Sequence, residues 1–273
     1  MVEITDQTGV HLALKEPALR IVSLVPSITE LLSELELDNE VKGITRFCIH
    51  PGHWKYCKTR IGGTKKIKHD MIENLQPDLI LANKEENTKE DVEKLREKFP
   101  VYTSDVKNLT DAIEMIQHTG LLTGREKQSH ELIFSIRNRF ERLRKIISGI
   151  PEKKALYLLW QNPYMSTGGD TFIHHIMQSA GFKNAFCHFT RYPELTEQQI
   201  KESGAEIVLL SSEPFPFNEK HVTKLKNILP GAKVILVDGT FFSWYGSRLA
   251  KAPDYFLKLR TRIGIMSSFD PQN

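Results

Sequence analysis

The middle of the chain carries the pattern that most limits how it can fold. From Arg125 to Ser148 no Gly or Pro interrupts a helical repeat, and Gly149 and Pro151 end it. The apolar residues of the repeat recur every three or four positions, at Leu132, Ile136, Phe140, Leu143 and Ile147. This spacing forms one face of a helix about 35 Å long. Such a helix either joins two domains or crosses over within one continuous sheet.

Short apolar runs alternate with amphipathic segments on both sides of this helix. Strands are expected at residues 20–25, 41–47, 79–82, 101–103, 154–160, 206–210 and 233–237. Helices are expected at residues 70–75, 88–98, 110–122, 171–180, 196–202, 218–228 and 247–263. Ser27 and Glu30 have the spacing of a capping box, with Ser27 as the N-cap of the helix after the first strand.

This alternation predicts an α/β fold, because strands that are linked by helices form parallel sheets with right-handed crossovers. We expect two lobes, each with a parallel sheet flanked by helices, joined by the long backbone helix. The predicted boundaries are residues 1–123 for the first lobe, 124–149 for the helix and 150–273 for the second lobe.

Composition excludes several classes of protein. The 37 basic and 34 acidic residues are interspersed, so no patch for nucleic acid is evident. Three cysteines do not make a disulfide framework. The polar start, Met1 to Asp6, lacks the features of a secretory signal, and no apolar run is long enough to span a membrane. We therefore expect a cytoplasmic protein as written, and a periplasmic one if a leader was removed.

Ligands of open α/β sheets bind beyond the carboxyl ends of the strands. Aromatic side chains gather in the loops that follow the predicted strands. These loops supply the candidate ligand-binding residues Pro26, Ser27, Arg46, Phe47, Glu85, Glu86, Trp160, Tyr164, Phe215, Phe242, Trp244, Tyr245 and Arg248. Arg191 joins Arg46 and Arg248 as a possible anchor for a carboxylate or phosphate. Alternatively, the rings pack under their own loops and the arginines form ion pairs.

One loop has residue types that suit a metal ion. Cys48, His50, His53 and Cys57 offer sulfur and imidazole, and we take Cys48, His50 and His53 as candidate ligands. Their spacing matches no standard zinc site, so an incidental loop is the alternative.

Several segments, in this order, resemble one known family. They are RIVSLVPSITE at 20–30, GGT at 62–64, LQPDLI at 75–80 and STGGD at 166–170. The family is that of the helical-backbone periplasmic-binding proteins, which carry cobalamin, haem and iron-siderophores to ABC transporters. The cobalamin-binding members are the most similar in pattern.

The resemblance implies a corrinoid, haem or metal-chelate ligand in a cleft between the lobes. It adds Thr64 and Lys65 to the ligand-binding residues and supports Tyr164, Phe242 and Trp244. Lys65 stands where the cobalamin binders have an aromatic residue. The resemblance also implies docking to an ABC transporter permease through one acidic residue per lobe. Asp70 falls at the first such position, whereas Gln198 aligns at the second and Glu197 lies beside it, so we take Asp70 and Glu197 as the docking residues.

We expect no required cofactor, no catalysis and a monomer. An intracellular relative that stores or senses such a ligand is one alternative. The other is a chelatase-like enzyme, which needs His50 or His53 to meet Glu85 or Glu86. No nucleophile or phosphate-binding motif supports an enzyme.

Overall fold

The computed structural model describes residues 1–267, which form two compact units. Unit 1 comprises Met1–Val106, Thr110–Ser135 and Trp244–Arg248. Unit 2 comprises Lys107–Leu109, Ile136–Ser243 and the described residues from Leu249 onward. We expected each lobe to be one consecutive stretch. Instead, Trp244–Arg248 belongs to unit 1 although it follows the last strand of unit 2.

Unit 1 is built on a five-stranded sheet in the order β5-β4-β3-β6-β7. Its strands are β3 (Ile21–Ser23), β4 (Val41–Ile44), β5 (Thr59–Arg60), β6 (Leu79–Asn83) and β7 (Val101–Ser104). Every neighbouring pair is parallel. All residues of β3, β6 and β7 are buried, which is typical of a parallel sheet covered on both faces.

Five helices belong mainly to unit 1, and all except the short α2 were expected from the sequence. They are α1 (Pro26–Glu34), α2 (Trp54–Cys57), α3 (His69–Leu75), α4 (Lys89–Arg96) and α5 (Leu109–Thr123). Helix α1 contacts β3, α3 contacts β4 and α4 contacts β7. The predicted cap at Thr88 is confirmed, because its hydroxyl accepts a hydrogen bond from the Asp91 amide at 3.3 Å.

An antiparallel hairpin precedes the sheet of unit 1 and was not expected from the sequence. Strand β1 (Val2–Thr5) pairs with β2 (His11–Leu14), with Val2 opposite Leu14. Gly9, at φ 87°, makes the turn in a conformation that favours glycine. The Asp6 carboxylate accepts hydrogen bonds from the Thr8 and Val10 amides at 2.8 and 2.9 Å, which fixes the turn.

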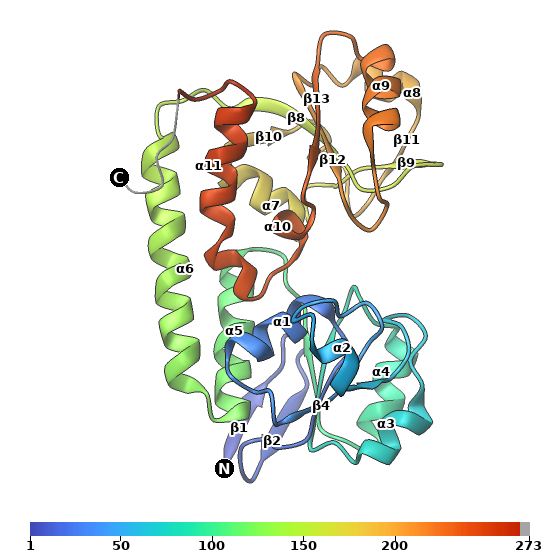
Figure 1. Ribbon diagram of the computed structural model, residues 1–273, viewed down its shortest axis with the longest axis vertical. Coiled ribbons are helices and arrows are strands. Elements are labelled where there is room, and N and C mark those ends of the chain that lie inside the picture. The colour runs from blue at the N-terminus through green and yellow to red at the C-terminus, as the bar shows by residue number, and fades with distance from the viewer. Residues whose placement is uncertain (268–273) are drawn as a thin grey trace. The chain divides into compact units, whose positions relative to one another are not determined.

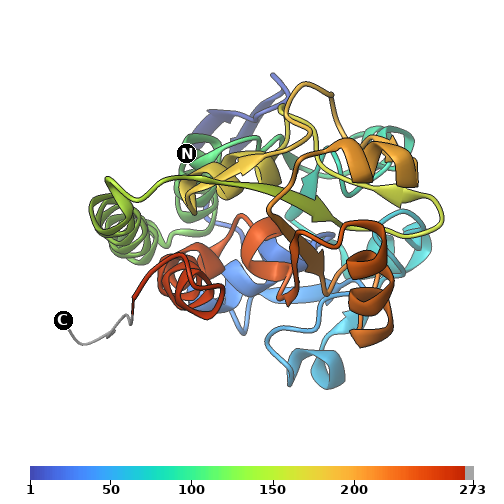
Figure 2. The same ribbon diagram turned by 90° about the horizontal axis from the view of Figure 1, so that it is seen from above.

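The long helix is α6 (Glu126–Ile147), and the prediction of one uninterrupted helix is confirmed (Figure 1). Its first part, to Ser135, belongs to unit 1, and the part from Ile136 belongs to unit 2. Within unit 2, α11 (Ala252–Arg262) lies alongside α6 in both views (Figures 1 and 2). Arg139 of α6 and Asp254 of α11 form an ion pair at 2.8 Å.

Unit 2 repeats the architecture with a four-stranded parallel sheet in the order β10-β8-β12-β13. Its strands are β8 (Lys153–Leu158), β10 (Phe182–Asn184), β12 (Ile207–Ser211) and β13 (Lys233–Val237). Two short strands, β9 (Tyr164–Met165) and β11 (Glu194–Leu195), form an antiparallel pair. The α/β fold with parallel sheets and flanking helices is therefore confirmed.

The helices of unit 2 follow the prediction except at the end. They are α7 (Phe172–Ser179), α8 (Glu197–Glu202), α9 (Glu219–Ile228), α10 (Thr240–Ser243) and α11. We expected one helix over residues 247–263, but the structure has a short 3-10 helix, η1 (Ser247–Ala250), before α11. Pro253 lies in the first turn of α11, where a residue without an amide hydrogen is tolerated, so a new helix begins there.

Candidate functional site

The carboxyl end of β3 leads directly into α1, but Ser27 does not cap this helix. Val25 is the N-cap and makes no side-chain hydrogen bond, while Pro26 occupies the first turn. Ser27 is a buried helical residue whose hydroxyl has no partner among residues 1–267. The predicted capping box is therefore wrong, because proline at the first helical position places the N-cap at Val25, two residues before Ser27.

Glu30, the other expected member of the capping box, holds Arg248 instead. The Arg248 guanidinium donates from Nε to Oε2 at 3.0 Å and from Nη2 to Oε1 at 2.6 Å. Both side chains are largely buried, at 13% and 20% exposure. The same guanidinium lies 4.8 Å from the ring centre of Trp244. Arg248 is thus used in an ion pair within unit 1, as the alternative interpretation holds.

The loop after β4 presents an aromatic ring and a cation at the surface of unit 1. Phe47 is 48% exposed, and the Arg46 guanidinium lies 4.8 Å from its ring centre. A Cβ at Gly63 would lie 3.2 Å from Phe47 Cε2, so this ring rests against the backbone of the glycine pair. The arrangement stacks a positive charge over one face of an exposed ring, so an aromatic surface and a cation are offered together, which suits a flat anionic ligand.

The loops after β5 and β6 are joined by hydrogen bonds. The Lys65 ammonium donates to the Glu85 carbonyl, and the Asn87 amide donates to the Thr64 carbonyl at 3.0 Å. The side-chain oxygen of Asn83 accepts from the amides of Glu85 and Glu86, at 2.9 and 3.2 Å. The structure therefore brings the predicted residues Thr64, Lys65, Glu85 and Glu86 together at one edge of the sheet.

The candidate metal residues are not brought together. Cys48 is buried and accepts a hydrogen bond from the Thr29 hydroxyl at 3.0 Å, and burial raises the pKa of its thiol. His53 lies 3.4 Å from Asp38, whereas the ring of His50 packs on Trp244 at 5.8 Å. Within residues 1–267 no group of three His, Cys, Asp or Glu side chains is arranged to hold a metal ion. Of the two cysteines in this loop, Cys48 is buried in unit 1 and Cys57 is exposed.

In unit 2, the loops after β8 and β12 form an aromatic cluster. Trp160 is 38% exposed and packs edge-on against Phe215 at 5.7 Å. Phe215 in turn packs against the buried Phe217 at 4.8 Å. Tyr164 is buried beneath the ammonium of Lys224, which lies 5.2 Å from its ring centre. The exposed part of this cluster is Trp160.

Two other predicted residues of unit 2 have structural roles. Phe242 is fully buried between Tyr157 and Phe256, with ring centres 5.2 and 5.1 Å away, so its prediction as a ligand contact is wrong. An apolar residue that follows a strand can either contact a ligand or pack in the core, and Phe242 packs in the core. The guanidinium of Arg191 lies 3.9 Å from the carboxylate of Asp170, which matches the ion-pair alternative.

Trp244 and Tyr245 lie in unit 1 rather than unit 2 and are 6% and 7% exposed. A Cβ at Gly246 would lie 2.6 Å from the Ser27 carbonyl oxygen, so only glycine allows this segment to pack so closely on α1. The two candidate docking residues occupy equivalent places: Asp70 and Glu197 are exposed in the first turns of α3 and α8. Glu197 also lies 3.4 Å from Lys224.

Comparison with known proteins identifies the family. The model of the family described as periplasmic binding protein matches residues 21–227. The chain belongs to this family. The match covers the unit 1 sheet, the whole of α6 and strands β8, β10 and β12 of the unit 2 sheet, and it ends before β13.

Curated relatives and solved structures are similar over most of the chain. An uncharacterized ABC transporter substrate-binding lipoprotein of Bacillus subtilis is 26% identical, over 76% of this chain and 68% of its own length. A vitamin B12-binding protein of Vibrio vulnificus is 25% identical, over 67% and 68%. The fold matches a periplasmic haem-binding protein of Pseudomonas aeruginosa with a TM-score of 0.78 and 17% identity, over 90% and 92%.

No helix within residues 1–267 combines the length and the apolar character needed to cross a membrane.

Proposed function

We propose that this chain binds a corrinoid, haem or another metal chelate and delivers it to an ABC transporter permease. It is a substrate-binding protein of the ABC-transporter type. The observation that supports this ligand class is the exposed pair of Arg46 and Phe47, which lies at the carboxyl end of the unit 1 sheet. Corrin and porphyrin rings present a broad flat face and carry polar or anionic groups at the edge. Phe47 supplies a stacking surface, and Arg46 supplies a charge for a carboxylate.

Relatives support the same class. The Vibrio vulnificus relative is named for vitamin B12, and the Pseudomonas aeruginosa structure is that of a haem-binding protein. Trp160 offers a second exposed aromatic surface, at the strand ends of unit 2. Lys65 adds a cation near Glu85, where it favours a ligand with an anionic edge.

Titration of the purified protein with cyanocobalamin, haemin and ferrichrome tests the ligand class. We expect one of them to bind with a dissociation constant of about 1 μM or lower and one molecule per chain. Phe47→Ala and Trp160→Ala should each weaken binding about tenfold, because each removes one aromatic surface. Phe134→Ala removes a ring that is 69% exposed on α6 and serves as the control. No binding of the three compounds, or equal loss in the control, contradicts the proposal.

The ligand is bound without turnover in this proposal, and the chelatase-like alternative is not favoured in a family of binding proteins. Incubation with protoporphyrin and Zn²⁺ or Fe²⁺ distinguishes the two. Metal insertion into the porphyrin ring is measured by absorbance. Its detection would establish chelatase activity. We also propose that the chain is a monomer, which light scattering at known concentration tests.

Asp70 and Glu197 are proposed to dock the permease. Each is an exposed carboxylate in the first turn of a helix, one in each unit. Asp70→Asn together with Glu197→Gln should abolish transport in cells and leave ligand affinity unchanged. Glu90→Gln, at an exposed acid in the first turn of α4, is the matched control. Transport that survives the double substitution would refute this assignment.

A transport role also requires that the protein acts outside the cytoplasmic membrane. The Bacillus subtilis relative is named as a lipoprotein. Fractionation of the source cells, with an antibody against this chain, tests the location. Recovery only in the cytoplasm would favour intracellular storage or sensing of the same ligand.

A further inference from the structure

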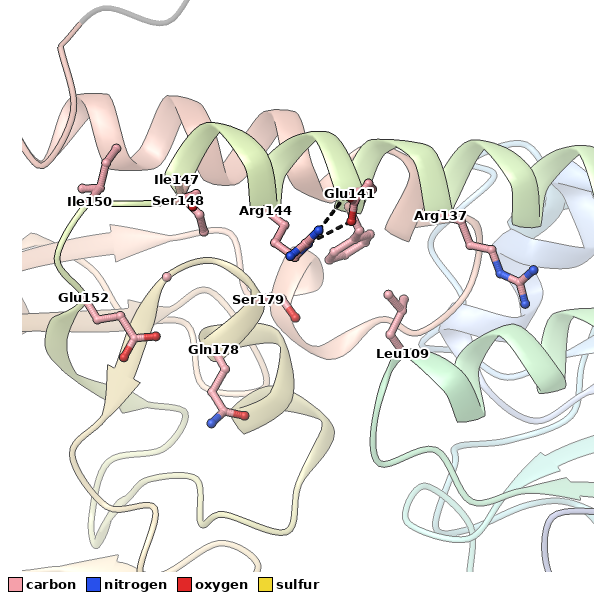
Figure 3. Close-up of a pocket in the computed structure, with 12 residues that line it drawn as sticks. Leu109, Arg137, Glu141, Arg144, Ile147, Ser148, Ile150, Glu152, Gln178 and Ser179 are labelled. Atoms are coloured by element: carbon pink, nitrogen blue, oxygen red, sulfur yellow. Dashed lines mark hydrogen bonds and ion pairs between the residues drawn. The ribbon is translucent and has the colours of Figure 1, made fainter.

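A pocket lies in unit 2, at the end of its sheet opposite to the loops that contain Trp160 and Phe215. Its volume is about 630 Å³, which is within the range of pockets that hold small organic molecules. It is lined by the second half of α6, by the connection from α6 to β8 and by the end of α7 (Figure 3). Ile150 and Glu152 precede β8 and Gly181 precedes β10, so the pocket is at the amino ends of these strands.

One face of α6 forms a wall of this pocket. The lining residues of the helix are Arg137, Phe140, Glu141, Arg144 and Ile147, which follow the spacing of a single face, and Ser148 follows directly after the helix. Phe140 and Ile147 contribute the apolar part of this wall, and Leu109 and Ile150 extend it. The pocket therefore has an apolar middle that suits a hydrocarbon or aromatic body.

The carboxylate of α6 in the pocket is already neutralised. Glu141 accepts two hydrogen bonds from Arg144, to Oε2 at 2.9 Å and to Oε1 at 2.8 Å (Figure 3). Lys145 lies 3.8 Å from the same carboxylate. Glu141 therefore does not repel an anion as an isolated carboxylate would.

Glu152 is the second carboxylate of the pocket, and Arg260 is a buried cation behind the pocket wall. Arg260 is fully buried and donates from Nη1 to the carbonyls of Ala180 and Gly181, at 3.1 and 2.9 Å. Burial lowers the pKa of this guanidinium, and the charge of Glu152 acts in the opposite direction. Since Gly181 lines the pocket, Arg260 lies directly behind its wall, and the charge of Glu152 is offset by Arg260.

Arg137 is the remaining charged residue among those that line the pocket. It is exposed, and within residues 1–267 its guanidinium has no hydrogen-bond or ion-pair partner. Figure 3 shows Arg137 and Leu109 at one end of the pocket and Glu152, Gln178 and Ile150 at the other. The pocket thus combines an apolar middle with one uncompensated positive charge at one end.

We propose that this pocket binds an amphipathic organic monoanion, with its carboxylate or sulfonate on Arg137 and its apolar body against Phe140, Ile147 and Leu109. The guanidinium pairs with two oxygens of the anionic group through two hydrogen bonds. The apolar body covers side chains that otherwise face water. This site is separate from the proposed chelate site, because its lining residues include none of the strand-end loops.

Calorimetric titration of the full chain with decanoate tests the proposal, with 1-decanol as the neutral match. We expect one decanoate per chain and weaker binding of the alcohol. Arg137→Gln should weaken decanoate binding about tenfold, as expected for one lost charge-assisted contact. Arg142→Gln removes the same charge from the same helix outside the pocket lining and should leave affinity within about twofold. Ser148→Trp, which fills the pocket, should abolish binding.

The position of binding is checked by amide chemical shifts, which should change at residues 147–152 and 178–181. Affinity for cyanocobalamin or haemin, whichever binds, should be the same in Arg137→Gln and the unaltered protein. The proposal is overturned by the absence of decanoate binding, by equal affinity for 1-decanol, or by equal losses in Arg137→Gln and Arg142→Gln. None of these results depends on whether the chelate proposal holds.

Discussion

Replacing Glu30 by Gln should destabilise unit 1, because it removes the negative charge and one of the two acceptor oxygens that pair with a largely buried arginine. The Arg248 guanidinium makes two hydrogen bonds to this carboxylate, at 3.0 and 2.6 Å, and is only 13% exposed. Breaking a fully buried pair from one side costs about 3–5 kcal/mol. Partial exposure and the contact with Trp244 reduce this, so we expect a loss of about 2 kcal/mol in the free energy of unfolding.

Urea unfolding followed by tryptophan fluorescence measures this loss. Trp54 and Trp244 are buried in unit 1, and Trp244 lies beside Arg248, so the signal reports mainly on this unit. With a urea dependence of about 2 kcal/mol per molar, the midpoint should fall by about 1 M.

Glu34→Gln is the matched control, because this exposed glutamate lies at the end of the same helix. Its effect should stay within about 0.5 kcal/mol. Adding Arg248→Gln to Glu30→Gln should cost less than the sum of the two single changes. Equal urea midpoints for Glu30→Gln and Glu34→Gln would refute a stabilising role of the Glu30–Arg248 pair.

Three further predictions concern local structure. Gly181→Ala should lower the free energy of unfolding by about 3 kcal/mol in thermal or urea unfolding, because φ is 76° and the new Cβ would lie 2.5 Å from Arg260 Nη1. Thr88→Ala should cost about 1 kcal/mol in the same assay, since it removes the acceptor of the Asp91 amide. Burial lowers the pKa of His118, so the unfolded chain binds a proton that the folded chain resists. Stability should therefore fall as the pH drops from about 7 to about 5, and His118→Gln should reduce this slope in urea titrations at each pH.

The parts of the fold with a regular sequence pattern were predictable. The apolar face from Leu132 to Ile147 predicts α6, because an uninterrupted repeat with clear end signals leaves few alternatives. Buried strands such as β6 and β12 appear as short apolar runs next to Pro or Gly. The hairpin of β1 and β2 was missed because its strands are short and half exposed, although Thr8-Gly9 is a turn signal.

The candidate site was predictable only in part. The strand-end rule selects Arg46, Phe47, Glu85 and Glu86, and the structure places all of them at the carboxyl edge of the unit 1 sheet. It does not distinguish a ligand contact from a core residue, so it also selected Phe242.

The pair of Glu30 and Arg248 was beyond local reasoning, because 218 positions separate the two residues and only the tertiary fold brings them together.

The return of Trp244–Arg248 to unit 1 has a consequence for how the protein is made. A ribosome releases the chain from its amino end, and domains generally fold as they emerge. Unit 1 lacks its last segment until residue 248 has been synthesised. Glu30 of α1 therefore lacks Arg248 as a partner while the whole unit 2 sheet is being synthesised. A gene fragment that ends at residue 123 encodes every strand of unit 1 but not this closing piece. The two units are therefore not separable modules of the gene, and nascent chains should acquire a stable unit 1 only after residue 248 has been synthesised.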